Sequence, residues 1–329
     1  MSSPQRPAPS LRSLDAVSRQ HLGDVERMLA DAVAGPDVVH AALRYHLETG
    51  GKRLRALIPG WIATNLGGDV SAGLALGVAV ELVHNGTLIH DDVQDGDEVR
   101  RGRPTVWRAF GMPQAINAGS WLMFAGASLA SRADASGVAV DLLQRALMRV
   151  IEGQGLEFEL QGRDAPTTAE WETMARAKTG VLFGAACALG AVASGLEPGQ
   201  RADLAAYGED LGVFFQLQDD LLDLLGDKGR GATATDIAEG KISHPVAWVA
   251  EHGEPASRAR LLAIIRTPRA ETGDALIAEA LDLLRTSGAL EASLASLAAR
   301  AKALEGAPWA SATPGLVARV LAPLAHIVT

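Results

Sequence analysis

The feature that most constrains this chain is its apolar residues, which recur at helical spacing almost throughout. Between turn signals we find no alternating apolar and polar pattern of the kind that predicts strands. Two segments, 71–90 and 179–195, are apolar nearly all the way round, which is typical of helices in the middle of a large bundle. We therefore expect an all-α helical bundle. Any polar group set into these helices must be paired or functional.

The expected helices are separated by turn signals such as Gly50 and Gly51. They cover residues 11–33, 38–48, 53–66, 71–96, 113–132, 138–162, 168–195, 200–226, 240–252, 256–266, 271–286, 288–305 and 315–327. No linker, repeat or low-complexity tract divides them, so we interpret residues 11–329 as a single domain. Residues 1–10, MSSPQRPAPS, are polar and Pro-rich, and we expect a disordered tail there rather than a signal peptide.

Composition narrows the class of protein and its partners. Hydrophobic residues make up 48% of the 329 residues and aromatic residues 4%, which favours an aliphatic globular protein. The net charge of −9 argues against a nucleic-acid partner. The single cysteine, Cys187, fits a reducing compartment, so we expect a cytoplasmic protein. The stretch 179–198 carries one charge and is mostly Ala and Gly, and we interpret it as a buried helix rather than a membrane span.

Two acidic clusters with identical spacing interrupt the apolar helices. Their members are Asp91, Asp92 and Asp95, and then Asp219, Asp220 and Asp223. In each cluster the first and last residues share one helix face, and the second lies on the neighbouring edge. One copy alone is often a solvated helix face, but two copies flanked by apolar residues favour a shared cage of six carboxylates. Oxygen ligands of this kind suit Mg²⁺, with substrate phosphates completing the shell, and the scarcity of nearby Cys and His disfavours zinc.

Basic residues near these clusters are candidates for phosphate binding. The segment GGKRLR places Lys52 and Arg55 on one face after a Gly pair, where backbone N–H groups favour an anion. A helix start with ordinary surface cations is the alternative. His84 lies two turns before Asp91 on the same face, close enough to serve a neighbouring anion, although a lone His in an apolar helix is often structural.

Further candidates follow the acidic clusters. Arg100 and Arg101 can hold phosphates with their guanidinium forks, or can instead pair with nearby acids. Gln216 precedes Asp219 and Asp220 by about one turn and shares their face. The remaining candidates are Lys178, Thr179 and Lys241.

Taken together, these motifs resemble the trans-isoprenyl diphosphate synthase, or polyprenyl synthetase, family, and within it the geranylgeranyl diphosphate synthases. The resemblance spans residues from about 40 to 250 and rests on GGKRLR, ELVHNGTLIHDDVQD, RRGRPTVW, GQGLEFELQGR, KTG, FFQLQDDLLD and EGKISHP, in family order. It implies a homodimer of single-domain bundles, each built around a large central cavity. Family members usually carry a Gly-Lys before the last motif, but here the segment DKGRGATATD is shortened and offers Lys228 or Arg230 instead.

The resemblance also implies roles for the candidate residues. About three Mg²⁺ ions would bind an allylic diphosphate. Their ligands would be Asp91, Asp95 and Asp219, with Asp92, Asp220 and Asp223 as partners. Positive charge would be added by Arg100, Lys178 and Lys241. Diphosphate would then leave, and the double bond of isopentenyl diphosphate would attack the allylic cation. Isopentenyl diphosphate would be held by Lys52, Arg55, His84 and Arg101, and the cation would be steadied by Thr179 and Gln216.

Product length is predicted from the residues before Asp91. The candidate walls of the product cavity are Thr87, Gly86, Val83 and Leu82. Because Gly86 and Thr87 are small, we expect geranylgeranyl diphosphate, with a longer polyprenyl product as the alternative. Gly86 could instead be small for close helix packing. A class I terpene cyclase is disfavoured because the second acidic cluster is all Asp, and a non-catalytic regulatory subunit because both clusters are kept.

Overall fold

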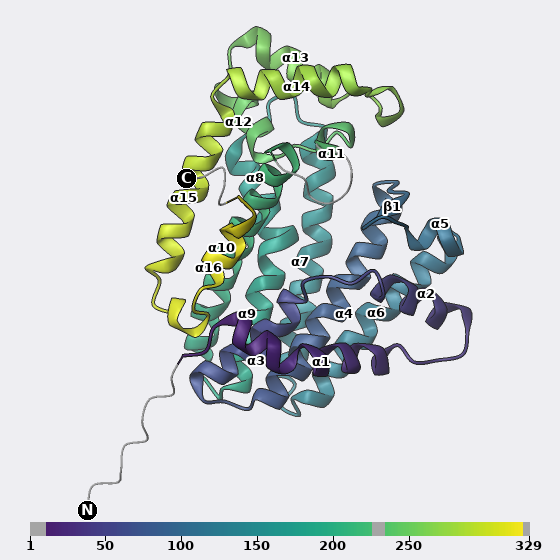
Figure 1. Ribbon diagram of the computed structural model, residues 1–329, viewed down its shortest axis with the longest axis vertical. Coiled ribbons are helices and arrows are strands. Elements are labelled where there is room, and N and C mark those ends of the chain that lie inside the picture. Colours follow the sequence, from purple (N-terminus) through teal and green to yellow (C-terminus); the bar gives the residue numbers. More distant parts are fainter. Residues whose placement is uncertain (1–10, 226–233, 325–329) are drawn as a thin grey trace, which may run out of the picture.

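The computed structural model describes residues 11–225 and 234–324. The expected tail at residues 1–10 lies outside the described residues. Within the described ranges the chain is almost entirely helical, which confirms the all-α prediction (Figure 1). One continuous cluster of buried apolar side chains extends from Leu14 in the first helix to Leu324 near the end of the described chain.

Most helices lie within the expected ranges, but the short helices Val106–Phe110 and Thr235–Ala238 lie where the sequence predicts none. The first part of the chain forms α1 (Leu14–Ala32), α2 (Val38–Leu47), α3 (Leu54–Leu66), α4 (Val70–Gln94), α5 (Val106–Phe110), α6 (Met112–Ala133) and α7 (Val138–Gln161). The second part forms α8 (Thr168–Ala175), α9 (Val181–Ala193), α10 (Pro198–Leu225), α11 (Thr235–Ala238), α12 (His244–His252), α13 (Pro255–Ile265), α14 (Asp274–Thr286), α15 (Ala289–Glu305) and α16 (Leu316–Leu321). Short 3₁₀ turns lie at η2 (Arg269–Glu271), η3 (Ala310–Ala312) and η4 (Ala322–Leu324).

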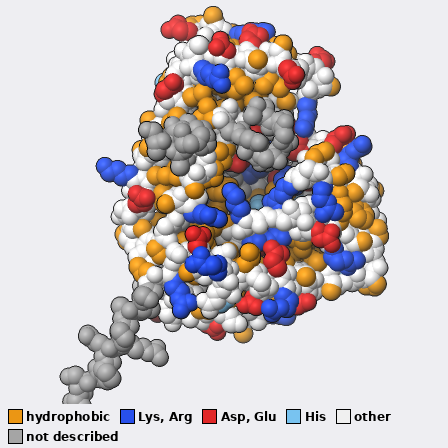
Figure 2. All heavy atoms as spheres, viewed as in Figure 1, with side chains coloured by type: hydrophobic (Ala, Val, Ile, Leu, Met, Phe, Trp, Pro, Cys, Tyr) orange, Lys and Arg blue, Asp and Glu red, His pale blue; other side chains and the backbone are white. Residues whose placement is uncertain are grey.

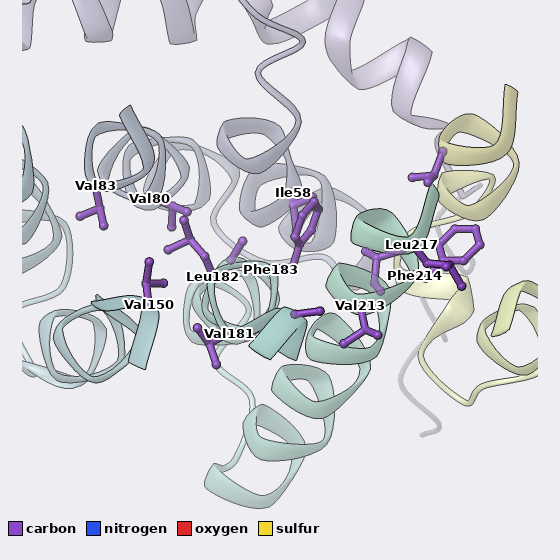
Figure 3. Close-up of a cluster of buried hydrophobic side chains, with 14 of the residues drawn as sticks. Ile58, Val80, Val83, Val150, Val181, Leu182, Phe183, Val213, Phe214 and Leu217 are labelled. Atoms are coloured by element: carbon purple, nitrogen blue, oxygen red, sulfur yellow. The ribbon is translucent and has the colours of Figure 1, made fainter. Parts of the chain in front are cut away.

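Helix α4 lies at the centre of the bundle. It packs against α3, α6 and α9, and α9 in turn packs against α10 and α7. Figure 3 shows Val80 and Val83 of α4 beside Val150 of α7 and Leu182 of α9, all of them buried. The pair α13 and α14 lies across the upper end of the bundle in Figure 1. The two acidic clusters, at the C-terminal ends of α4 and α10, are therefore placed below this cross-piece.

Two local features depart from the expected helices. A short antiparallel ribbon joins β1 (Val99–Arg100) to β2 (Arg103–Pro104), so the expectation of no strands is wrong here. Its turn residues, Arg101 and Gly102, have φ of 52° and 76°, the geometry that a two-residue hairpin requires. The expected helix over 168–195 is divided by a π-helical turn, η1 (Arg176–Gly180), and such turns are common at functional sites.

Two helical stretches, Val70–Gln94 and Thr168–Ala193, are long and apolar enough to cross a membrane. In the most apolar part of each, 78% and 83% of the residues are buried inside the protein. Burial on this scale is what core helices show, since their apolar surface is covered by neighbouring helices.

Glycine residues in α4 allow its backbone to lie in contact with the backbones of α3 and α6. A Cβ at Gly77 would lie 1.9 Å from the carbonyl oxygen of Ala56 in α3. A Cβ at Gly86 would lie 2.7 Å from the carbonyl oxygen of Gly119 in α6. The geometry therefore supports close helix packing at Gly86, and its role in product length stays a prediction. A bulky residue at Gly86 would separate α4 from α6.

We predict that Gly77→Ala lowers the free energy of unfolding by about 3 kcal/mol, because the added methyl overlaps a backbone carbonyl that cannot move alone. Urea denaturation followed by circular dichroism measures the change. Gly23→Ala is the matched control: it lies in α1 with open space around it, so it should be neutral or stabilising by about 0.5–1 kcal/mol. Equal effects of the two substitutions would contradict the packing argument.

Candidate active site

A cavity of about 1300 Å³ opens between the start of α3, the C-terminal ends of α4 and α10, and the turn η2. Figure 2 shows the hollow on the face viewed, with Lys and Arg side chains gathered around it. Five of the sequence-predicted binding residues line it together: Lys52, Arg55, His84, Arg100 and Arg101. Asp219 lines it from α10. Segments far apart in the sequence thus meet in one pocket.

The start of α3 is fixed by Arg53, which sequence reasoning did not select. Arg53 adopts a left-handed backbone conformation with φ of 47° and is only 3% exposed. Its guanidinium pairs with Glu26 at 2.8 Å and Glu81 at 3.4 Å, and donates to the carbonyl oxygen of Leu47 at 2.9 Å. Because Arg53 is tied to α1, α2 and α4 in this way, it sets where the neighbouring Lys52 and Arg55 project.

Arg55 and His84 form a contact at the floor of the cavity. The Arg55 guanidinium lies 4.3 Å from the ring centroid of Phe183 and donates to Nε2 of His84 at 3.2 Å. Burial lowers the pKa of Arg55 to about 10. Burial, reinforced by the charge of Arg55, also holds the pKa of His84 well below its ordinary value. His84 is therefore neutral, and since Nε2 accepts, its proton lies on Nδ1. It can approach an anion only as a neutral hydrogen-bond donor.

The three acids of the first cluster lie in different charge environments. Asp92 is 1% exposed, and Arg100 holds its Oδ1 from Nε at 2.7 Å and Nη2 at 2.6 Å. Burial raises the pKa of Asp92 to about 6, against the opposing effect of Arg100. Asp95 instead faces Lys241, whose Nζ lies 3.1 Å from Oδ2. Burial also raises the pKa of Asp91, while the nearby charge of Lys178 works to lower it.

The second cluster divides in the same manner. Asp220, only 3% exposed, accepts hydrogen bonds from Trp171 Nε1 at 2.9 Å, Gln216 Nε2 at 2.9 Å and the backbone N–H of His244 at 2.8 Å. Asp223 accepts from Thr235 Oγ1 at 2.8 Å and from the N–H of Asp236 at 3.0 Å, which fixes the start of α11. Asp219 is the member of this cluster that lines the cavity.

These partners correct the expected cage of six carboxylates. Asp92, Asp220 and Asp223 are held by internal donors, and within residues 11–225 and 234–324 no three acidic, His or Cys side chains are close enough to hold a metal. The oxygen donors nevertheless fit a divalent cation that keeps water and phosphate ligands. Asp92 Oδ2 is buried without a partner in the described chain, so the site retains unused acceptor capacity.

The remaining sequence-predicted candidates, Lys178, Thr179 and Lys241, are each held by another polar side chain. The π-helical turn η1 presents Lys178, whose Nζ pairs with Glu157, and Thr179, whose Oγ1 donates to Gln216 Oε1 at 2.8 Å. Burial acts to lower the pKa of Lys241, but the carboxylates of Glu239 and Asp95 raise it well above its ordinary value. Lys228 and Arg230 lie outside the described residues, so the choice between them stays open.

Three charged residues near the acidic clusters are not among the sequence-predicted site residues: Glu157, Glu239 and Arg269. The first two lie in the quoted segments GQGLEFELQGR and EGKISHP, so an acid near a predicted cation was a usable signal. Glu239 pairs with Lys241 at 2.8 Å. Arg269 belongs to no motif. Its position in the turn η2, with Nη1 2.8 Å from Asp97 Oδ1, depends on the tertiary fold.

The chain-length residues are placed mostly away from this cavity. Leu82 lines a separate pocket between α1, α4 and α6, beside Met28 and Trp121. Its expected role as a wall of the product cavity stays a prediction. Val83 is fully buried and Thr87 is 8% exposed. Their role in product length stays a prediction.

Comparison with known proteins identifies the family. Residues 36–284 match the polyprenyl synthetase family model. The chain is 39% identical over 223 residues to a geranylgeranyl pyrophosphate synthase of Geoglobus acetivorans, covering 66% of this chain and 70% of that protein. It is 34% identical to a short chain isoprenyl diphosphate synthase of Methanocaldococcus jannaschii, covering 81% and 82%. A polyprenyl synthase of Caulobacter crescentus, solved with calcium and isoprenyl diphosphate, superposes with a TM-score of 0.82 at 30% identity, covering 96% and 98%.

The chain therefore belongs to the polyprenyl synthetase family, as the sequence motifs predict. It is an enzyme of the prenyltransferase class.

Adjacent aspartates of α10 offer a paired test of this geometry. Asp220→Asn should lower the free energy of unfolding by about 2 kcal/mol, because a charged acceptor of three hydrogen bonds is lost. Asp219→Asn, at a partly exposed position on the cavity wall one residue away, should lower it by less. Urea denaturation of both variants measures the difference. A greater loss of stability in Asp219→Asn would reverse the assignment.

Proposed function

We propose that this chain is a magnesium-dependent prenyltransferase that joins isopentenyl diphosphate to an allylic prenyl diphosphate, with geranylgeranyl diphosphate as its product. The observation that carries the proposal is one cavity bordered both by basic side chains, which can bind a diphosphate directly, and by a carboxylate, which can bind one through a metal ion. Lys52, Arg55 and Arg101 border it on one side, and Asp219 borders it on the other. Such a cavity can hold two diphosphates at once, as a condensation between two charged substrates requires.

In this proposal the carboxylates of Asp91, Asp95 and Asp219 would hold about three Mg²⁺ ions, and the charge of these ions would make diphosphate a better leaving group. Lys178 and Lys241 approach the same diphosphate from η1 and from the segment before α12. The bond between the allylic carbon and the diphosphate oxygen breaks first. The terminal alkene carbon of isopentenyl diphosphate then bonds to the allylic carbon, and a proton passes to the departed diphosphate.

The residues near the cation have separate tasks in this scheme. Thr179 and Gln216 supply oxygen dipoles that stabilise positive carbon. Arg55 is held under Phe183 and beside His84, so its guanidinium keeps a fixed direction toward isopentenyl diphosphate. Buried side chains such as Val83, Val150 and Leu182 form an apolar cluster inside the bundle (Figure 3), and in this proposal the apolar interior keeps water from the cation.

A homodimer is also proposed. Large apolar side chains are exposed along α6 and α7: Met112, Ile116, Phe124, Met148, Ile151 and Phe158. Phe124 is 77% exposed, which is costly for a Phe in water and is relieved if a second copy covers it. Sedimentation of the purified chain tests this, and a monomer at micromolar concentration would contradict it.

We further propose a cytoplasmic location and no nucleic-acid partner, on the charge and cysteine content described above.

Incubation with isopentenyl diphosphate, each allylic primer and Mg²⁺, followed by chromatography of the products, tests the proposed reaction. We expect a twenty-carbon product as the main species. If the main products with all primers contain more than twenty carbons, the longer polyprenyl alternative is favoured. A cyclic hydrocarbon formed from one allylic diphosphate would indicate a cyclase, and inactivity of the folded chain alone would indicate a regulatory subunit.

Metal dependence is the second prediction of this proposal. Asp91→Asn should reduce kcat by about 10³-fold with unchanged helical circular dichroism, because it removes a ligand and not a packing contact. Chelation of the wild-type enzyme should abolish turnover, and added Mg²⁺ should restore it. Asp203→Asn is the control substitution, since Asp203 is an exposed acid in the first half of α10. Full turnover after chelation would rule out the metal site.

A further inference from the structure

Five charged side chains form a chain of contacts across the mouth of the cavity. Lys241 lies between Asp95, at 3.1 Å, and Glu239, at 2.8 Å. Arg269 pairs with Glu239 at 3.4 Å and with Asp97 at 2.8 Å, and it donates to the carbonyl oxygen of Asp95 at 3.4 Å. We call this set the mouth network. It joins the end of α4, the segment between α11 and α12, and the turn η2.

Lys241 has two carboxylate partners, and this sharing has a chemical consequence. An ammonium paired with Asp95 alone would compete directly with any cation that Asp95 is to bind. Glu239 draws the same ammonium toward itself, and its side chain is only 7% exposed, so water screens the attraction weakly. Arg269 in turn holds Glu239 from the solvent side. Lys241 therefore keeps a fixed place beside Asp95 without depending on it as sole partner.

We propose that Glu239 is a positioning residue that shares Lys241 with Asp95, leaving Asp95 open to the metal and the Lys241 ammonium open to the allylic diphosphate. Arg269 supports this arrangement by holding Glu239 and the loop at Asp97. The inference rests on the proposed function, because it assigns a task within the same site. It concerns only the allylic half of the site, since the mouth network contains none of Lys52, Arg55 or His84.

The first measurement is calorimetric binding of Mg²⁺ in the presence of inorganic diphosphate, which requires no turnover. In Glu239→Gln, Lys241 keeps Asp95 as its remaining carboxylate partner in the mouth network, so the half-saturating Mg²⁺ concentration should rise about tenfold. In steady-state assays, KM for the allylic diphosphate should rise by a similar factor, and KM for isopentenyl diphosphate should change by less than about twofold.

A double-mutant cycle shows whether Glu239 acts by positioning Lys241 or by a general effect on the fold or on the electrostatic potential of the site. If Glu239 acts through Lys241, then Glu239→Gln should have little further effect on Mg²⁺ binding in a Lys241→Gln background. If it acts independently, the tenfold change persists in that background and the proposal is overturned. Equal changes in the KM values of both substrates would also overturn it, because a positioning role at Asp95 cannot reach the isopentenyl site.

The supporting role of Arg269 has a matched control. Arg269 and Arg260 are 48% and 50% exposed, and each pairs with a glutamate, but Arg260 pairs with Glu279 between α13 and α14, away from the cavity. Arg269→Gln should raise the half-saturating Mg²⁺ concentration by about threefold, and Arg260→Gln should leave it unchanged. If Glu239→Gln does not fold, the comparison of Arg269→Gln with Arg260→Gln tests the proposal instead. The same half-saturating Mg²⁺ concentration in both variants would overturn the proposal.

Measurements on the wild-type chain distinguish a failure of the proposed function from a failure of the proposed role of Glu239. A wild-type chain that fails to elongate any prenyl diphosphate would contradict the proposed function. The calorimetric cycle would still report whether Glu239 governs cation binding through Lys241.

Discussion

Burial of charge inside an aliphatic bundle is the constraint on which the site depends. A charged group removed from water is tolerated only when a partner or hydrogen bonds replace the lost hydration. Arg53 is therefore tied to Glu26 and Glu81, and Asp92 to Arg100. These contacts connect α1, α3, α4 and the β1–β2 ribbon. The same pairings that make buried charge tolerable thus hold the helix ends at the distances that the cavity requires.

Adjacent acids in one helical motif acquire opposite tasks because successive residues project about 100° apart. In α10 the first acid of the pair, Asp219, reaches the cavity, while Asp220 turns inward to Trp171 and the start of α12. In α4 the inward member is Asp92. In α10 the two adjacent aspartates therefore have different places: Asp220 anchors the helix end, and Asp219 lines the cavity.

Much of this could be predicted from the sequence, because helical spacing and the paired acidic motifs are local patterns. The helix bounds and the joint placement of Lys52, Arg55 and Arg101 at one cavity followed from them. The directions in which the side chains of α4 point could not be predicted in this way, because they depend on which helix packs against each face of α4. Leu82 faces its own pocket and Gly86 meets the backbone of α6, although both lie one or two turns from Asp91. Arg269 could not be found at all, because the folding of α13 and α14 brings it to Asp97.

The π-helical turn η1 carries one residue more than a regular helical turn would, and the surplus is spread over five residues. Upstream of it, Trp171 reaches Asp220, and downstream of it, Phe183 lies under Arg55. Removing a single residue from this turn would restore a regular helix and rotate one side relative to the other by about 100°. One of the two aromatic rings would then lose its partner. The helical register of this long segment, and not only its composition, is therefore fixed by its contacts with Asp220 and Arg55.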